Sequence, residues 1–425
     1  MFRIIFCFLV VQLSFSQGYT EYITGSILDL NVEPDFGICL MGGASESDEA
    51  MIWFLNKANA GDVVVLRTSG SDGYNNYFYS QLGVSINSVR TFVIDNEEGA
   101  TNAYLLDKVE KAEAIWFAGG DQFDYVSYFK DNALEDALND FVNTKGGVIG
   151  GTSAGMAILG SGYFSAENGT VTNEQALGNP YHNRMTLGYN DFLEIPFLED
   201  VITDTHYDDP DRRGRHSAFL ARYATDNGSR ALGIACNEYT AVCIDNDGRA
   251  HVFGDYPNYE EHAFFIQTNC VLDYLPENCM PNIPLNWMRN NEALKVYKVP
   301  GTANGENYFD VSDWQTGSGG VWQNWSVNNG AFASASGLNP NCNDLLNTPD
   351  FELEFINIYP NPFTDVLAIQ SKDENLAFQF FDISGKRIAI TIDSNRIDTA
   401  SLESGIYFLI VESQNFAQVF KLIKN

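Results

Sequence analysis

The residue of this chain best suited to chemistry is a serine within a glycine-rich turn. Residues 147–160 read Gly-Val-Ile-Gly-Gly-Thr-Ser-Ala-Gly-Met-Ala-Ile-Leu-Gly. Small and β-branched residues lead up to Ser153 and an apolar, helix-like segment follows it, which is the strand–turn–helix layout of a nucleophile elbow. The flanking glycines permit a sharp turn, and the backbone N–H of Ala154 would face an oxyanion from the start of the helix. A plain turn with a solvated serine fits the same pentapeptide, so the other residues must decide.

A serine nucleophile needs a base within hydrogen-bond reach, and the base needs an orienting partner. The chain has five histidines, at positions 182, 206, 216, 251 and 262. His206 follows a predicted strand and is therefore expected at the same sheet edge as Ser153. Glu238, at the end of a later strand, competes for the orienting role with Asp204 and Asp208, which are nearer in sequence. The residue types alone leave the choice among these three carboxylates open.

A glycine pair after another predicted strand suits an oxyanion hole. Gly119 and Gly120 follow the apolar run 114–117, and a backbone without side chains can approach a substrate closely. The N–H of Gly120, together with that of Ala154, would then hold an oxyanion. Gln122 could hydrogen-bond a substrate amide. The same glycines could equally form an ordinary turn at the end of a strand.

Four motifs occur in the order and rough spacing of the cyanophycinases, and the chain resembles that family from about residue 36 to about residue 270. The motifs are Gly119-Gly120-Asp121-Gln122, Gly151-Thr152-Ser153-Ala154-Gly155, Asp204-Thr205-His206 and Gly233-Ile234-Ala235-Cys236-Asn237-Glu238-Tyr239-Thr240-Ala241. The resemblance implies a serine peptidase related to aspartyl dipeptidase that needs no cofactor. It also implies the triad Ser153, His206 and Glu238, in an order that differs from that of α/β-hydrolases, where the acid precedes the histidine.

Cyanophycinases cleave β-aspartyl-arginine backbones from the carboxyl end, and arginines after the histidine hold substrate carboxylates. By the same resemblance Arg213 and Arg215 take this role here, and Asp121 and Asp204 are expected to contact substrate. The chain departs from the family in the extra residues 208–211 and in an alanine where a further arginine is expected. A reshaped pocket is therefore expected, which puts cyanophycin itself in question as the substrate. A homodimer is a further implication of the resemblance.

Two alternatives remain beside a peptidase that cleaves β-aspartyl bonds or other Asp-containing peptide bonds. One is an α-aspartyl dipeptidase, or another exopeptidase, that uses the same three residues. The other is a surface protein that retains the fold and binds its ligand without cleaving it. Covalent labelling of Ser153 separates the binding protein from the enzymes, and a panel of Asp-X dipeptides tested beside cyanophycin separates the two enzymes.

Apolar runs that alternate with amphipathic segments predict the elements that position these residues. Buried strands are expected at residues 36–41, 63–66, 89–94 and 114–117 and directly before Ser153. Helices are expected from about Ser47 and around residues 134–142. The alternation is typical of an α/β domain with a doubly wound, mostly parallel sheet, which the resemblance narrows to a class I glutamine amidotransferase-like fold. Functional residues are expected at the carboxyl ends of its strands.

The chain beyond the serine is expected to continue this domain to residue 284. A polar stretch, residues 161–190, is predicted to be a surface loop that carries His182. Strand and helix segments are then expected at residues 197–203, 212–224, 232–236 and 240–244. Residues 285–350 are rich in Trp, Asn, Gly and Ser, and we expect them to form a small β extension and a linker.

A second, all-β domain is predicted over residues 351–425. Strand-like runs recur at residues 366–369, 377–381, 406–411 and 419–423, and such close spacing favours a small sandwich. Three motifs in it resemble the C-terminal sorting domain of the type IX secretion system: Tyr359-Pro360-Asn361-Pro362, Leu402-Glu403-Ser404-Gly405-Ile406-Tyr407 and Lys421-Leu422-Ile423-Lys424. The resemblance implies the type IX machinery as a partner and export to the cell surface or beyond.

The first 16 residues predict how the chain leaves the cytoplasm. A short basic start, an apolar run and small residues before Gln17 are typical of a secretory signal peptide, and export permits disulfides. The formal net charge is −32, from 56 acidic and 24 basic residues. Nucleic acid and anionic membrane surfaces are therefore disfavoured as partners, because both need clustered lysine and arginine.

The seven cysteines, one of which leaves with the signal peptide, suggest disulfides and no metal site. The expected pairs are Cys270 with Cys279 and, with less support, Cys236 with Cys243. Cys39 is expected in the core, and Cys342 has no obvious mate. No cysteine or histidine spacing suits zinc, so no metal is expected.

Overall fold

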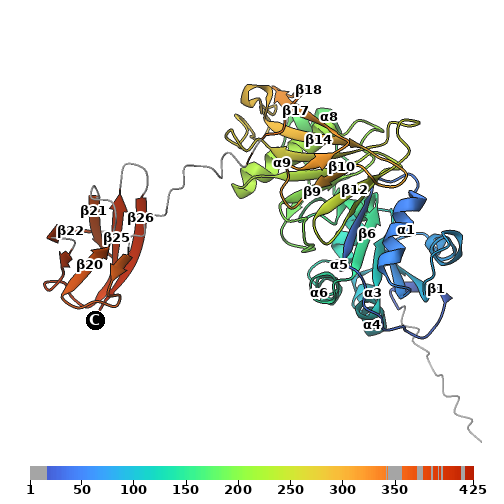
Figure 1. Ribbon diagram of the computed structural model, residues 1–425, viewed down its shortest axis with the longest axis horizontal. Helices are drawn as coiled ribbons and strands as arrows, with labels where there is room; N and C mark the ends of the chain where they lie inside the picture. Colours follow the sequence, from blue (N-terminus) through green and yellow to red (C-terminus); the bar gives the residue numbers. More distant parts are fainter. Residues whose placement is uncertain are drawn as a thin grey trace, which may run out of the picture. The chain divides into compact units, whose positions relative to one another are not determined.

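Figure 1 shows the computed structural model of the chain, which describes residues 17–340, 342, 357–370, 377–383, 386–390, 392–393, 396–412 and 417–425. The chain divides into two units, Met1–Cys342 and Asn343–Asn425, and each is described by itself. The signal peptide predicted for residues 1–16 lies outside the described residues. No helix in the described part of the chain is long and apolar enough to cross a membrane.

A ten-stranded sheet runs through the first unit, in the order β1-β4-β3-β5-β6-β2-β11-β12-β15-β16. The strands from β4 to β2 are mutually parallel, as the buried apolar runs predict, and the outer pairs are antiparallel. The bounds are β1 (Tyr19–Gly25), β2 (Gly37–Met41), β3 (Asp62–Arg67), β4 (Ser88–Ile94), β5 (Ala114–Phe117), β6 (Val148–Thr152), β11 (Ala241–Ile244), β12 (Arg249–Phe253), β15 (Tyr308–Asp310) and β16 (Gly317–Ser318).

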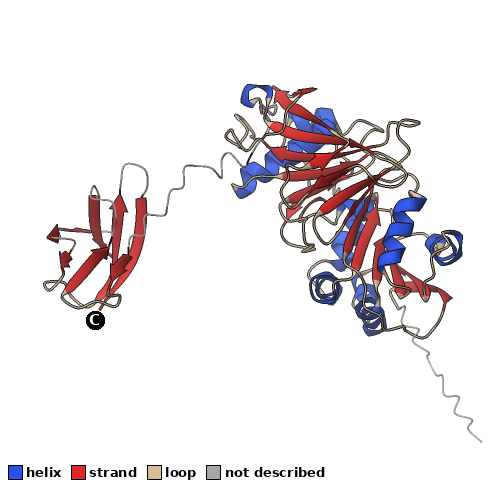
Figure 2. Cartoon of the chain, viewed as in Figure 1, coloured by secondary structure: helices blue, strands red, loops and turns tan. Residues whose placement is uncertain are grey.

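Helices cover both faces of the parallel strands (Figures 1 and 2). One face carries α1 (Asp48–Lys57), α2 (Gly73–Asn76) and the π-helical turn η1 (Tyr77–Gln81). The other carries α3 (Glu97–Ala100), α4 (Ala103–Lys111), α5 (Gln122–Phe129), α6 (Ala133–Asp140) and the π-helical turn η2 (Phe141–Lys145). The first of these helices begins where the sequence predicts, because the Ser47 side chain accepts a hydrogen bond from the backbone N–H of Ala50.

A second sheet of eight strands, which the sequence analysis did not anticipate, completes the first unit in the order β18-β17-β14-β13-β10-β9-β7-β8. The bounds are β7 (Gly162–Phe164), β8 (Leu187–Tyr189), β9 (Val201–Asp204), β10 (Leu232–Cys236), β13 (His262–Thr268), β14 (Leu294–Pro300), β17 (Val321–Asn328) and β18 (Ala331–Ser336). The predicted strands 232–236 and 240–244 are present as β10 and β11, but they belong to different sheets. The expectation of one continuous sheet is therefore wrong, because the β10–β11 connection crosses from the second sheet to the first.

The second sheet packs against α9 (Arg213–Asn227), which is in contact with α8 (Asn173–Gly178). The sequence predicts a surface loop over residues 161–190, and this prediction is wrong because the stretch contains α8, β7 and β8. A capping box between Thr172 and Gln175 starts α8. The polar composition of this stretch therefore reflects helix capping and turns around short elements.

Residues 285–350 contribute strands to both sheets, and within this range the structure describes residues 285–340 and residue 342. The strands β14, β17 and β18 extend the second sheet, while β15 and β16 form one edge of the first. The β structure expected for this stretch is present, and it is continuous with the peptidase-like unit up to Cys342.

The described disulfide joins Cys270 to Cys342, so the expected pairing of Cys270 with Cys279 is wrong. Cys279 is buried in the apolar cluster beneath the second sheet, where it packs as a small hydrophobic residue. Cys236 and Cys243 are also free and buried, since they lie on strands of different sheets. Cys39 lies in the core, as predicted.

We predict that non-reducing peptide mapping will recover a Cys270–Cys342 cross-link and free thiols at the other four described cysteines. The bridge closes a loop with a sequence separation of 72 residues. Loop-closure entropy for a loop of that length corresponds to about 4 kcal/mol of unfolding free energy. The double substitution C270S/C342S is expected to lower the free energy of unfolding by up to that amount in a denaturant titration. A Cys270–Cys279 cross-linked peptide would contradict the assignment.

The second unit contains, in its described residues, two four-stranded sheets in the orders β19-β20-β24-β23 and β22-β21-β25-β26. The bounds are β19 (Asn357–Tyr359), β20 (Val366–Gln370), β21 (Ala377–Asp382), β22 (Arg387–Ile388), β23 (Ile392–Asp393), β24 (Arg396–Asp398), β25 (Gly405–Glu412) and β26 (Ala417–Lys424). Both sheets contribute to one buried cluster, with Leu367 and Ile397 from one and Phe380 and Leu409 from the other. The four predicted strand runs fall within β20, β21, β25 and β26.

Candidate active site

Ser153 lies on a strained turn between β6 and the short helix α7 (Ala154–Ala157). Its backbone has φ 53° and ψ −116°, a conformation that a residue with a side chain rarely adopts. The turn is held because Ser153 N donates to the carbonyl of Met41 at 3.1 Å. Glycine is required at position 155, where a Cβ would lie 2.2 Å from the carbonyl oxygen of Phe117. The local sequence therefore produces the sharp strand-to-helix turn that was predicted and exposes the serine side chain on it.

His206 approaches the serine from the second sheet. It follows β9, and its backbone N–H donates to the carbonyl of Gly42 at 2.8 Å. Its Nε2 lies 2.8 Å from Ser153 Oγ. The expectation that both residues lie at one edge of one sheet is wrong, because the serine follows a strand of the first sheet and the histidine one of the second.

Glu238 lies on the connection that crosses between the sheets, and its Oε1 is 2.6 Å from His206 Nδ1. A carboxylate can only accept a hydrogen bond, so Nδ1 carries the proton and Nε2 is free to accept the proton of the serine. The other two candidate orienters are occupied elsewhere: Asp204 pairs with Arg215, and Asp208 accepts a hydrogen bond from the backbone N–H of Glu238 at 2.9 Å. Geometry thus selects Glu238 among the three carboxylates.

The Gly119-Gly120 turn lies beside the serine. A Cβ at Gly119 would be 4.0 Å from Ser153 Oγ, whereas one at Gly120 would face Thr68 and Ser69. Among the described residues, no carbonyl accepts the N–H of Gly119, Gly120 or Ala154. Free backbone donors therefore adjoin the nucleophile, and Gly119 is the nearer of the two predicted glycines.

Asp121 and Gln122 have partners within the protein. The Asp121 carboxylate caps α5 by accepting the backbone N–H of Phe123 at 2.9 Å. The Nε2 of Gln122 donates to the carbonyl of Phe164 at 3.3 Å, which leaves its amide oxygen free to accept a hydrogen bond. The Asp121 carboxylate therefore stabilises the start of α5. Among the described residues, the amide oxygen of Gln122 has no partner and could accept a hydrogen bond from a ligand.

Asp204 and Arg215 form a buried ion pair instead of the expected substrate contacts. Their side chains are 4% and 5% exposed, and Arg215 Nε lies 2.9 Å from Asp204 Oδ2. The remaining Nη1 of Arg215 donates to Thr170 Oγ1 at 3.1 Å. Burial raises the pKa of Asp204, but the Arg215 guanidinium outweighs it and holds the pKa below its ordinary value of 3.8. Neither side chain is accessible to a substrate, so both predictions of substrate binding are wrong.

The substitution Arg215→Met is predicted to destabilise the first unit by about 3–5 kcal/mol, because it leaves the Asp204 carboxylate buried without a counter-charge. Chemical denaturation at pH 7 measures this. Arg213→Met is the matched control, since Arg213 forms a more exposed ion pair with Asp211 and should cost about 1 kcal/mol or less.

The pH dependence of this pair has a defined sign. The pKa of Asp204 is lowered in the folded state, so the stabilisation is present above about pH 4, the pKa of an unfolded aspartate, and is lost as the pH falls through the folded pKa. Equal stability of the Arg215 and Arg213 variants at pH 7 would contradict the assigned role of the buried pair.

Arg213 lines a cavity of about 240 Å³, to which the sequence neighbours of His206 and Glu238 also contribute. Its walls are Tyr207, Asp208, Asp211, Arg213, Asn237, Phe264, Lys298 and Gln323. The Arg213 guanidinium is held by Asp211 through two hydrogen bonds, of 2.9 and 2.8 Å. The sequence analysis missed Lys298 and Gln323, because they lie far beyond the recognised motifs and only the pairing of β14 and β17 brings them here. Arg212 also contacts the segment that carries His206, because its Nη1 donates to the carbonyl of Thr205 at 3.0 Å.

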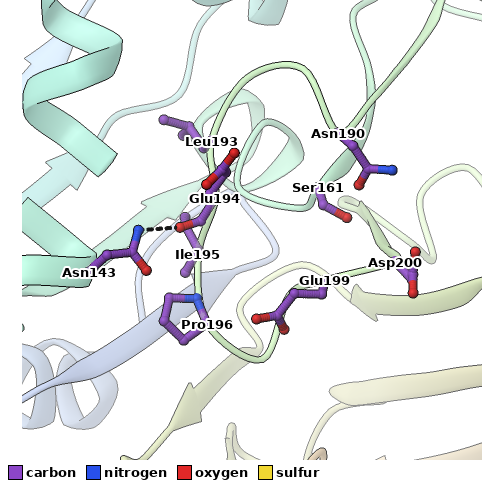
Figure 3. A pocket seen from close by; sticks show the side chains of 9 residues that line it. All are labelled: Asn143, Ser161, Asn190, Leu193, Glu194, Ile195, Pro196, Glu199 and Asp200. Carbon is purple, nitrogen blue, oxygen red and sulfur yellow. Dashed lines mark hydrogen bonds between the residues drawn. The ribbon is translucent and has the colours of Figure 1, made fainter. Parts of the chain in front are cut away.

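A separate cavity of about 300 Å³ is lined mainly by residues between β8 and β9 and, like the first, by none of Ser153, His206 and Glu238. Figure 3 shows its lining residues, among them Asn143, whose side chain donates to the backbone carbonyl of Glu194 at 2.8 Å. The described residues contain no group of three or more histidine, cysteine or acidic side chains arranged to hold a metal ion.

Gly43 is predicted to be essential for the position of His206. A Cβ at Gly43 would lie 2.5 Å from the imidazole Cε1 and Nε2, and the backbone there has φ +111°. Gly43→Ala should displace the ring, and a misplacement of about 1 Å costs roughly 10²-fold in rate. The measurement is the rate at which an organophosphonate modifies Ser153.

The matched control for this substitution is Gly83→Ala. Gly83 also has a positive φ, of +72°, but a Cβ there would meet no atom within 4 Å. This variant carries the backbone strain without touching the histidine, and it should react with the phosphonate as the wild type does. An unchanged rate in Gly43→Ala would show that the ring position does not limit the reactivity of Ser153.

Two regions of the chain match known protein families. Residues 69–252 match peptidase family S51, and residues 357–425 match the secretion system C-terminal sorting domain. A cyanophycinase of Geminocystis herdmanii (strain PCC 6308) is 27% identical over 162 residues, which cover 38% of this chain and 53% of that protein. A cyanophycinase of Synechococcus elongatus is 25% identical over 171 residues, which cover 40% of this chain and 48% of that protein. The chain thus spans about half the length of the curated relatives it matches.

Among solved structures, a peptidase from an acI-B1 Actinobacterium is similar at 16% identity with a TM-score of 0.39. The similarity covers 54% of this chain and 94% of that one. A second similar structure, a putative peptidase E protein from Listeria monocytogenes EGD-e, has a TM-score of 0.31 at 16% identity and covers 52% of this chain and 97% of that one.

Proposed function

We propose that this chain, a cyanophycinase-like peptidase of family S51 joined to a secretion sorting domain, is an exported serine peptidase that cleaves β-aspartyl or other Asp-containing peptide bonds. The observation that carries the proposal is the hydrogen-bonded series from Ser153 Oγ to His206 at 2.8 Å and from His206 to Glu238 at 2.6 Å. A serine becomes a nucleophile at neutral pH when a histidine accepts its proton and a carboxylate orients that histidine.

The geometry supports acyl transfer in two steps. In the first, Ser153 Oγ bonds to the substrate carbonyl carbon while its proton passes to His206 Nε2. Backbone N–H groups of the Gly119-Gly120 turn and Ala154 hold the oxyanion. The carbon–nitrogen bond then breaks, and His206 delivers the proton to the leaving amine. In the second step a water molecule, deprotonated by the same histidine, hydrolyses the acyl-serine and releases the acid.

The proposed substrate class follows from the relatives and from how this chain differs from them. The matched relatives are cyanophycinases, so a β-aspartyl bond is the first candidate. Two features alter the pocket. Arg215 is occupied by its buried ion pair with Asp204. Of the extra residues 208–211, Asp208 and Asp211 line the cavity. These features favour an Asp-containing peptide other than cyanophycin over the polymer itself.

Export is proposed to follow two successive signals. The predicted signal peptide directs the chain out of the cytoplasm, and the sorting domain over residues 357–425 directs it through the type IX secretion system to the cell surface or medium. The carboxyl-terminal unit has its own buried cluster, which is consistent with a domain that is recognised separately from the peptidase unit.

Ser153→Ala is predicted to lower kcat by about 10⁴-fold or more against β-Asp-Arg and Asp-X dipeptides while leaving the unfolding transition unchanged. Hydrolysis of a cyanophycin suspension and of a dipeptide panel should be measured side by side. Glu238→Gln retains the size of the side chain but alters the hydrogen bond to His206, and it should lower kcat by about 10²-fold or more.

The outcomes of this experiment separate the alternatives. Cleavage of α-Asp-X dipeptides alone would favour an α-aspartyl dipeptidase with the same triad. Absence of organophosphonate labelling at Ser153 in the folded protein would favour a non-catalytic binding protein. Turnover by Ser153→Ala at the wild-type rate would refute the proposed nucleophile.

A further inference from the structure

The cavity beside the candidate triad draws part of its wall from beyond the peptidase-family match. Asn237 precedes Glu238 and Tyr207 follows His206, so part of the wall comes from the two chain segments that carry the histidine and the glutamate. Phe264, Lys298 and Gln323 complete it from β13, β14 and β17. The family match ends at residue 252, so these three positions are a feature of this chain's second sheet.

Lys298 is a cation without a counter-ion in this wall. It is half-buried on β14, directly opposite Phe264 in the strand register, with its Nζ 5.8 Å from the Phe264 ring centroid. Its Nζ forms no ion pair or hydrogen bond with any residue that the structure describes. Arg213, which also lines the cavity, already has its carboxylate partner in Asp211. The ammonium of Lys298 is therefore the free positive charge among the lining residues.

Other polar atoms of the wall also lack partners among the described residues. Gln323 uses its Oε1 to accept the indole N–H of Trp325 at 3.0 Å, which leaves its Nε2 donor free. Arg213 uses Nε and Nη2 for Asp211, which leaves Nη1. The Asp208 carboxylate accepts the backbone N–H of Glu238. Lys298, Gln323 and Arg213 thus each contribute a free donor to the lining of one cavity.

Without a bound anion, the partly buried ammonium of Lys298 is electrostatically unfavourable. Burial lowers the pKa of Lys298, the exposed Glu260 raises it, and the Arg213 guanidinium lowers it further, with a net decrease. A partly desolvated ammonium with a like charge nearby gains more from an arriving carboxylate than an exposed lysine does. The physical environment therefore suits an anionic ligand.

We propose that Lys298 is a specificity-determining residue that binds a carboxylate of the peptide substrate in this cavity, with Gln323 Nε2 and Arg213 Nη1 as additional donors. The inference rests on the proposed peptidase function, because the cavity can bind a peptide substrate for cleavage only if the candidate triad is catalytic. The substrate would carry a negatively charged group within reach of the bond that Ser153 attacks.

The test compares Asp-containing dipeptides that have a free C-terminal or side-chain carboxylate with the corresponding amides. Lys298→Met, which keeps an apolar stem against Phe264, should raise KM for the acids by about tenfold to a hundredfold, the range expected for loss of a charge-assisted hydrogen bond. Its kcat should stay within about twofold, since Lys298 does not contact the reacting atoms. KM for the amides should not change, and Lys298→Arg should restore the preference for acids.

Lys111→Met is the matched control, because Lys111 is an exposed lysine on α4, ion-paired with Asp107 and distant in the fold from the cavity. The inference would be overturned if the wild type cleaved acids and amides with equal kinetics or cleaved neither. It would also be overturned if Lys298→Met raised KM equally for both. Labelling of Ser153 by a neutral organophosphonate distinguishes the two failures. A wild type that is labelled but shows no role for Lys298 loses only this inference, whereas one that is not labelled loses the proposed function.

Discussion

The carboxyl end of β2 holds the candidate triad together through main-chain hydrogen bonds. Ser153, His206 and Tyr239 each donate a backbone N–H to carbonyls of residues 41–43, at 3.1, 2.8 and 3.1 Å. The first donor belongs to the turn after β6, the second follows a strand of the other sheet, and the third follows Glu238. Three chain segments that are far apart in sequence are thus fixed against one short stretch of backbone. Gly43 leaves room for the imidazole and Gly42 for the backbone of Asn237, and this explains why a side chain at Gly43 would be incompatible with the site.

A buried network on α9 anchors the histidine from the other side. Asp204 and Tyr207 flank the Thr205-His206 dipeptide, and they are held by consecutive residues of that helix. Asp204 pairs with Arg215, and Tyr207 Oη contacts His216 Nδ1 at 3.1 Å. Burial lowers the pKa of His216 to about 4, so this histidine stays neutral at physiological pH. A charged pair and a neutral histidine therefore hold the segment that carries His206.

The second sheet determines which charged residues near the motifs are buried and which line the cavity. An arginine that the family resemblance assigns to the substrate points into the interior, while a lysine from β14 faces the cavity. The Cys270–Cys342 bridge ties the end of the first unit to the loop after β13. It thereby constrains the segment that carries both Lys298 and Gln323. The proposed carboxylate site accordingly depends on strands outside the matched peptidase region.

Local features of the fold were readable from the sequence because they depend on neighbouring residues alone. The apolar run 114–117 coincides with β5, Ser47 caps α1, and the glycines around Ser153 produce its turn. His206 was selected because it follows a predicted strand, whereas Glu238 was selected by family resemblance, since the residue types left the orienting acid open. Each of these depends on spacing within a few residues or on a motif read as a whole.

Tertiary structure alone decided which strands pair and which charges meet. The strands β10 and β11 are five residues apart yet join different sheets, and nothing in their own composition indicates this because both are buried apolar runs. For the same reason Cys270 pairs with a cysteine 72 positions away, and Arg215 is neutralised by Asp204 instead of meeting substrate. Long-range pairing is set by the total burial and hydrogen bonding of the whole sheet. The sequence by itself therefore determined the candidate serine and its turn, while the tertiary structure determined the residues that surround it.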